Sequence, residues 1–144
     1  MKILILNGPN LNLLGKRDKS HYGEHSLSDI ENLVKDEFKN HLFEFYQSNS
    51  EGELVDQIQK AETYFDGIII NPGGYAHTSV AIRDALNESN LPKIEVHLSN
   101  LAKREEFRQI NITASVCDGY LSGFKHLGYL AAVYLLEKIK QRTF

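Results

Sequence analysis

The spacing of Glu95 and His97 is the feature of the sequence that most directly suggests chemistry. Residues 94–100 are typical of a β-strand, in which side chains alternate between two faces, so Glu95, His97 and Ser99 share one face. A carboxylate two residues from a histidine can orient the imidazole ring, and a histidine held in this way at a strand end is a reasonable general acid. A core histidine bonded to its neighbour would give the same letters, and the strand alone favours that second interpretation.

A second candidate lies in the long loop after the first apolar run, where Arg17 precedes Tyr22 by five residues. The phenol of a free tyrosine has a pKa of about 10, so it is a poor base near neutrality unless a cation favours the phenolate. A shift of roughly three units corresponds to about 4 kcal/mol, which a desolvated arginine can supply. Such loops can close over a substrate, and we expect a lid at about residues 15–25. An exposed loop with an unrelated arginine and tyrosine explains these two residues equally well.

The third candidate stretch, residues 71–79, follows another apolar run and contains the pair Gly73-Gly74. Paired glycines let a backbone approach a ligand closely. His77 then lies near the start of a predicted helix, where exposed N–H groups favour an anion. A tight turn followed by a helix cap would also explain these residues. Asp84, further along the same helix, is typical of a solvated surface.

Strands and helices alternate along the chain and must position these residues. Short aliphatic runs predict strands at residues 2–6, 42–46, 67–70, 93–98 and near 120–121. Apolar residues at helical spacing predict helices at residues 27–38, around 54–61, at 79–86 and from 127 onward. We expect Ser28 and Glu31 to form a capping box, Thr78 or Ser79 to cap the third helix, and Leu127, Leu130 and Tyr134 to mark the last.

This alternation predicts a parallel sheet with helices on both faces. In such folds ligands bind beyond the carboxyl ends of the strands, near the point where the strand order reverses. The three polar stretches that follow the first, third and fourth predicted strands all fall at this edge.

The composition fits one compact domain, which we expect to span residues 1–144. Hydrophobic residues make up 42% and charged residues 24%, and the net charge of −3 gives no reason to expect nucleic acid or a membrane as partner. Cys117 is the only cysteine, which excludes an intramolecular disulfide and a cysteine cage for a metal. The first apolar run is too short for a signal peptide or a membrane span, so we expect a cytoplasmic protein.

Three blocks of the sequence together resemble the type II 3-dehydroquinate dehydratase family. They are Asn7-Gly8-Pro9-Asn10-Leu11 with Leu14-Gly15, the stretch from Asn71 to Asp84, and the stretch from Glu95 to Arg108. The resemblance runs from about residue 2 to the closing helix. It implies a flavodoxin-like α/β fold, a three-layer sandwich with a five-stranded parallel sheet, one strand for each apolar run. It also implies a hydro-lyase that converts 3-dehydroquinate to 3-dehydroshikimate through an enolate, with no cofactor and no metal.

The catalytic roles follow from the resemblance alone. Tyr22 would take a proton from the carbon next to the substrate ketone, and Arg17 would favour the ionised form of Tyr22. A water positioned through Asn10 would hold the enolate. His97, oriented by Glu95, would protonate the departing tertiary hydroxyl. The reaction belongs to the shikimate pathway of aromatic amino acid biosynthesis, and quinate breakdown uses it as well.

The substrate-binding roles also follow from the resemblance. Substrate hydroxyls would be held by Asn71, His77 and Arg108, and the carboxylate by backbone groups at Leu98 and Ser99. Asp84 would reach the ligand from a neighbouring subunit, because the family assembles as trimers packed into a dodecamer.

Two segments depart from the family pattern. The lid residues 18–21 lack the proline that is common in relatives, and residues 117–120 are more polar than expected before a buried last strand. Tyr75, directly after the glycine pair, is bulky at a position that could line the pocket, and the sequence does not assign it a role.

Three rival functions of this fold fit the sequence less well. A phosphate- or flavin-binding module needs a phosphate loop rich in Ser, Thr or Gly after the first strand, where this chain has Pro9 and Leu11. A phospho-acceptor domain needs acidic residues where Asn7 and Asn71 stand. A metal hydrolase needs a ligand set, which the six histidines do not form. A small-ligand or phosphate-binding module of this fold without catalysis is the remaining alternative.

Overall fold

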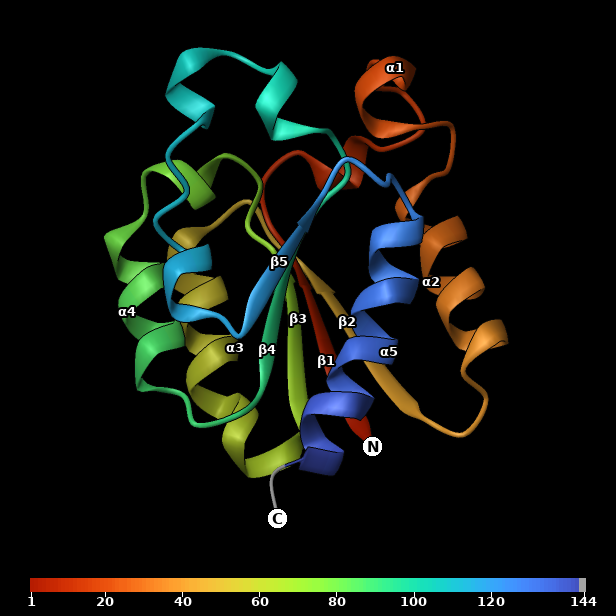
Figure 1. Ribbon diagram of the computed structural model, residues 1–144, viewed down its shortest axis with the longest axis vertical. Helices are drawn as coiled ribbons and strands as arrows, with labels where there is room; N and C mark the ends of the chain where they lie inside the picture. The colour runs from red at the N-terminus through yellow and green to blue at the C-terminus, as the bar shows by residue number, and fades with distance from the viewer. Residues whose placement is uncertain (143–144) are drawn as a thin grey trace.

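The computed structural model describes residues 1–142, and its centre is a five-stranded sheet in the order β2-β1-β3-β4-β5 (Figure 1). All four strand pairings are parallel. The strands are β1 (Lys2–Asn7), β2 (Leu42–Gln47), β3 (Gly67–Asn71), β4 (Lys93–His97) and β5 (Gly119–Ser122). This strand order is that of flavodoxin-like folds, and it confirms the predicted fold class.

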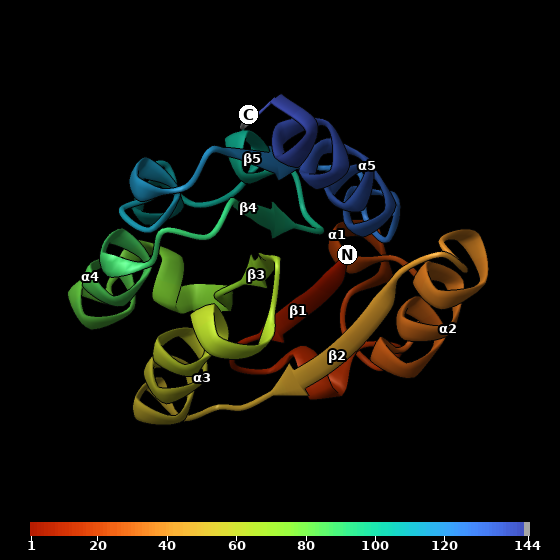
Figure 2. The same cartoon turned by 90° about the horizontal axis from the view of Figure 1, so that it is seen from below.

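Helices cover both faces of the sheet, with α2 and α5 on one side and α3 and α4 on the other (Figure 2). The α-helices are α1 (Lys19–Tyr22), α2 (Leu27–Glu37), α3 (Glu51–Tyr64), α4 (Val80–Glu88) and α5 (Leu127–Arg142). Short 3₁₀ helices occupy the connections: η1 (Leu11–Leu13), η2 (Gly73–His77), η3 (Leu101–Lys103), η4 (Glu106–Arg108) and η5 (Ala114–Val116). All five strands run in the same direction, so they end at one edge of the sheet, and the N-terminus and the end of α5 lie at the opposite edge (Figure 1).

The core has two layers because successive residues of a central strand face opposite sides. In β1, Ile3 and Ile5 pack with α2 and α5, while Leu4 and Leu6 pack with α3 and α4. Both sides are fully buried, which is why the central strands consist of continuous apolar runs. The interruption of this pattern at β4, where Glu95 is completely buried, therefore requires compensating polar contacts.

The start of α2 differs from its prediction. Ser26 is the N-cap, and its hydroxyl accepts from the backbone N–H of Asp29 at 3.1 Å, while the Asp29 carboxylate accepts from the N–H of Ser26 at 2.9 Å. The predicted capping box of Ser28 and Glu31 is wrong, because the helix begins at Leu27 and Ser28 already lies in its first turn. The bond from the Ser26 N–H lowers the pKa of the Asp29 carboxyl, which keeps this cap charged. At α4, the predicted cap by Ser79 is confirmed.

Helix α5 is confirmed, but of the three residues that indicated it only Leu130 packs against the core. Leu127 and Tyr134 are each 53% exposed, whereas Gly128, Tyr129 and Ala132 are buried. Small residues let the helix lie close to the sheet, and a Cβ added at Gly128 would stand only 3.0 Å from a methyl group of Val96. The edge strand β5 is partly exposed, which explains why the residues that precede it are polar.

Candidate active site

A pocket opens at the edge of the sheet where β1, β3 and β4 end. Its walls come from the loop after β1, the segment around α1, the turn after β3 and the segment after β4. The predicted site residues that line it are Asn10, Arg17, Tyr22, Asn71, His77, His97, Leu98, Ser99 and Arg108. The parallel topology therefore brings together residues as far apart in the sequence as Asn10 and Arg108.

The predicted site residues Glu95 and Asp84 are not among the residues that line the pocket, and neither is Tyr75. Glu95 is fully buried directly behind His97. Asp84 is on the exposed side of α4, where its carboxylate pairs with Arg83 at 3.1 Å and its side chain is 63% exposed. The hydroxyl of Tyr75 donates to the carbonyl of Asn49 at 2.9 Å, which ties η2 to the segment between β2 and α3.

The segment expected to form a lid contains the single helical turn α1. Asp18 caps this turn by accepting from Ser20, and the side-chain and backbone hydrogen bonds from Ser20 lower the pKa of the Asp18 carboxyl. Arg17 donates from Nη2 to the Tyr22 hydroxyl oxygen at 2.8 Å, and its guanidinium carbon lies 3.7 Å from the centre of the Tyr22 ring. Arg17 therefore contacts both the hydroxyl and the ring face of Tyr22 at the pocket.

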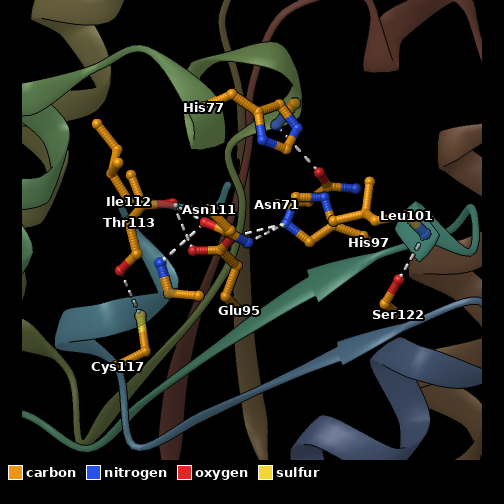
Figure 3. A network of polar contacts seen from close by, with 12 residues as sticks. Asn71, His77, Glu95, His97, Leu101, Asn111, Ile112, Thr113, Cys117 and Ser122 are labelled. Carbon is orange, nitrogen blue, oxygen red and sulfur yellow. Dashed lines mark hydrogen bonds and ion pairs between the residues drawn. The ribbon is translucent and has the colours of Figure 1, made fainter. Parts of the chain in front are cut away.

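His97 is held by Glu95 through a 2.5 Å contact between Nε2 and a carboxylate oxygen (Figure 3). A carboxylate can only accept, so Nε2 carries a hydrogen. The ring is only 5% exposed and lines the pocket, so Nδ1 is the nitrogen left to exchange a proton with a ligand. The side chains therefore share one face of β4, as the alternation predicted.

His77 faces the same pocket, with its ring centre 6.3 Å from that of His97. Its Nδ1 contacts the carbonyl oxygen of Ile110 at 2.7 Å, so Nδ1 carries the hydrogen. The buried Nε2 has no hydrogen-bond partner within residues 1–142. In the neutral ring this nitrogen is an acceptor, which suits a ligand hydroxyl.

Asn71 is fixed from both sides of its amide. Its oxygen accepts from the Gly73 N–H at 3.1 Å, and its nitrogen donates to the Tyr129 hydroxyl at 3.3 Å. Tyr129 in turn donates to the side-chain oxygen of Asn7 at 2.5 Å. Burial raises the pKa of the Tyr129 phenol, so it remains a neutral donor. Sequence reasoning missed Tyr129 because it reads as an ordinary apolar residue of the last helix.

Three arginines line the pocket, and no carboxylate is among its described lining residues. Arg104 was not predicted as a site residue, although its side chain is only 8% exposed. It donates to the Ser99 hydroxyl at 2.9 Å, and its guanidinium carbon lies 5.4 Å from the Tyr22 ring. Its neighbour Arg108 binds Glu105, which lowers the pKa of that carboxyl. The positive lining suits an anionic ligand.

The described residues offer neither a metal site nor a membrane span. Within residues 1–142, no three His, Cys, Asp or Glu side chains are grouped so that they could hold a metal ion. No helix in this range is long and apolar enough to cross a bilayer.

Cys117 is expected to react slowly with alkylating reagents in the folded protein. Burial, together with the negative charge of Glu95, raises the pKa of its thiol to about 12. Only the thiolate is nucleophilic, so iodoacetamide at mildly alkaline pH should modify the native protein at least about a hundredfold more slowly than protein unfolded in urea. Mass spectrometry of timed samples measures both rates. Equal rates would contradict the burial of this thiol.

Comparison with known proteins gives a consistent result along the whole chain. Residues 1–137 match the family model described as dehydroquinase class II. The 3-dehydroquinate dehydratase of Thermotoga maritima is 49% identical, with 99% of this chain and 100% of that protein covered. That of Fusobacterium nucleatum is 51% identical, with 95% and 97% covered. The crystal structure of type II dehydroquinase from Butyrivibrio crossotus superposes with a TM-score of 0.92 at 49% identity, covering 95% of this chain and 97% of that one.

Proposed function

The chain belongs to the class II dehydroquinase family and is a hydro-lyase that removes water from 3-dehydroquinate to form 3-dehydroshikimate, and we propose that Tyr22 and His97 carry the two proton transfers. The observation that carries this proposal is the pairing of each residue with a charged partner at one pocket. Tyr22 has Arg17 at 2.8 Å, and His97 has Glu95 at 2.5 Å.

Tyr22 acts first, as the general base. Its phenolate takes a proton from the carbon next to the substrate ketone, and the electron pair of that C–H bond moves to the ketone oxygen as an enolate. The Arg17 guanidinium stabilises the phenolate before the transfer and the nearby negative charge after it. Asn10, at the pocket wall in a left-handed conformation with φ of 68°, positions the water that holds the enolate oxygen.

His97 completes the elimination as the general acid. The enolate electrons return to form the carbon–carbon double bond, the bond to the tertiary hydroxyl breaks, and Nδ1 of His97 supplies the proton with which the hydroxyl leaves as water. Glu95 keeps the ring in place and stabilises the imidazolium that exists before the transfer. After each turnover, Tyr22 loses its proton to solvent and His97 takes up a proton from solvent.

The remaining lining residues bind the substrate. His77 accepts from one hydroxyl through Nε2, and Asn71 and Arg108 bind the others. The backbone at Leu98 and Ser99 holds the substrate carboxylate, to which the positive lining is also attracted. Residues 15–25 close as a lid over the bound substrate and exclude water.

Asp84 joins the site from a neighbouring subunit in a dodecamer built from trimers, acting in the cytoplasm. Its exposed carboxylate supports this role, as do large apolar side chains left exposed on α4 and in the connection between β4 and β5. They include Val80 at 59%, Phe107 at 67% and Ile110 at 72%. Exposed apolar side chains of this size are typical of surfaces that bury one another on assembly.

The function is tested by mixing metal-stripped protein with 3-dehydroquinate and following the ultraviolet absorbance of the conjugated product. None of the described lining residues is a lysine, so we expect turnover to persist after treatment with borohydride in the presence of substrate. Loss of activity after borohydride would indicate a Schiff base and contradict the mechanism. Binding of 3-dehydroquinate without product would favour the alternative, a ligand-binding module without catalysis.

A further inference from the structure

We propose that Asn111 and Thr113 are positioning residues for the general acid, acting on His97 through Glu95. The inference rests on the proposed role of His97 in proton transfer. Neither residue lines the pocket, and neither belongs to a strand or an α-helix. Their side chains nevertheless converge on the buried carboxylate behind His97 (Figure 3).

Glu95 accepts from three side chains, which occupy both of its carboxylate oxygens. His97 and the Asn111 amide nitrogen contact Oε1 at 2.5 and 2.6 Å. The Thr113 hydroxyl contacts Oε2 at 2.6 Å. Glu95 and Thr113 are both completely buried, so water cannot replace a donor that is lost. The three donors together fix the plane of this carboxylate.

The orientation of the Asn111 amide is determined by its other contacts. Its oxygen lies 3.0 Å from the backbone N–H of Ala114, which can only donate, so the amide nitrogen is the atom that faces Glu95. The same nitrogen lies 3.2 Å from Nε2 of His97. Because Nε2–H and the amide are both donors, the carboxylate oxygen between them is their common acceptor. Asn111 therefore limits where the imidazole ring can lie.

The segment that carries these residues is anchored on η2. The backbone N–H groups of Ile112 and Thr113 donate to the carbonyl of Ala76 at 2.9 and 3.4 Å. Two residues before Ile112, the Ile110 carbonyl accepts from His77. Residues 110–113 thus determine which ring nitrogen of His77 carries the hydrogen, and they also help to position the ring of His97.

Replacing Thr113 by valine removes one donor at nearly constant shape. The carboxylate of Glu95 is then free to rotate and His97 to move with it. We expect kcat to fall about tenfold, less than the hundredfold that a displacement of about 1 Å can cost. KM should stay within about twofold, because the substrate pocket is untouched. Asn111→Ala should act in the same direction, and Thr113→Ser, which restores the hydroxyl, should regain most of the activity.

The pH profile separates this role from a merely structural one. Thr113→Val removes a donor from the carboxylate, which disfavours the charged form that stabilises an imidazolium at His97. The acidic limb of the kcat profile should then move to higher pH. The other titratable groups around this carboxylate are His97 on β4, His77 on η2 and Cys117 before β5. The same variant should also shift the imidazole ¹⁵N signals of His97, a readout that needs no turnover.

Ser115→Ala is the matched control. Ser115 lies in the same segment, but its hydroxyl donates to the carbonyl of Ile112 and does not contact Glu95. This variant should match the parent in kcat, pH profile and His97 signals. If Thr113→Val behaved like Ser115→Ala, the inference would be overturned.

A double-mutant cycle distinguishes failure of this inference from failure of the proposed function. In a Glu95→Gln background, Thr113→Val should have little further effect on kcat, because the charge on which it acts is gone. An undiminished tenfold loss in that background would mean that Thr113 acts through packing, and would overturn the inference. Normal turnover by both Glu95→Gln and Tyr22→Phe would instead overturn the proposed mechanism itself.

Discussion

Tyr22→Phe is expected to lower kcat by about a thousandfold, within the range of about 10² to 10⁴ that general acid–base catalysis contributes. The variant loses only the hydroxyl that we propose as the base. It keeps the ring that packs 3.7 Å from the Arg17 guanidinium, so the lid segment retains its main contact. KM should therefore change little. Steady-state kinetics of the purified variant, followed through the ultraviolet absorbance of the product, measures both constants.

Tyr75→Phe is the control for loss of a phenol. Its hydroxyl bonds to the Asn49 carbonyl outside the pocket, so turnover should remain close to that of the parent. Turnover by Tyr22→Phe within a factor of about ten of the parent would contradict the assignment of Tyr22 as the base. The Arg17–Tyr22 contact would then have only a structural role in the lid.

Glu95→Gln should produce the second large loss, about a hundredfold or more in kcat. The carboxylate accepts from His97, Asn111 and Thr113, whereas an amide offers one acceptor oxygen and adds two hydrogens. At least one donor loses its acceptor in a fully buried site, and the neutral side chain cannot stabilise an imidazolium at His97. Substrate contacts are unchanged, so the loss should appear in kcat, measured across pH.

The same substitution should lower the free energy of unfolding by about 1–3 kcal/mol, the usual cost of leaving a buried polar group without its partner. Urea denaturation followed by circular dichroism measures this difference. Glu44→Gln is the control, because Glu44 lies on the edge strand β2 with a side chain that is 56% exposed. An active and stable Glu95→Gln protein would show that the carboxyl charge is dispensable for His97.

The fold and most of the pocket were predictable because two regular patterns carried the information. Short apolar runs alternate with segments whose apolar residues recur at helical spacing, and this alternation indicated the parallel sheet. The polar residues of the site follow the strands whose ends meet at one edge of that sheet. Glu95 and His97 share a face through the alternation of β4 alone. No structural information beyond the strand itself was needed to place that pair together.

Residues outside such patterns could not be placed. Asn111 and Thr113 lie in an irregular connection, where no period determines the direction of a side chain. Tyr129 lies among apolar residues of α5, and the partners of its hydroxyl are distant in sequence. The error at the start of α2 has a different origin: a serine stands on each side of Leu27, each followed three residues later by an acid, and the motif alone does not decide between them.

The position of the chain ends has a practical consequence for attaching this protein to a surface. Met1 directly precedes β1 at the edge of the sheet opposite the pocket, and α5 runs back to that same edge (Figure 1). An affinity tag or a tether fused at Met1 would leave from the far side of the molecule. An immobilised catalyst prepared in this way presents the mouth of the pocket to the flowing solution, with no linker crossing the path of the substrate.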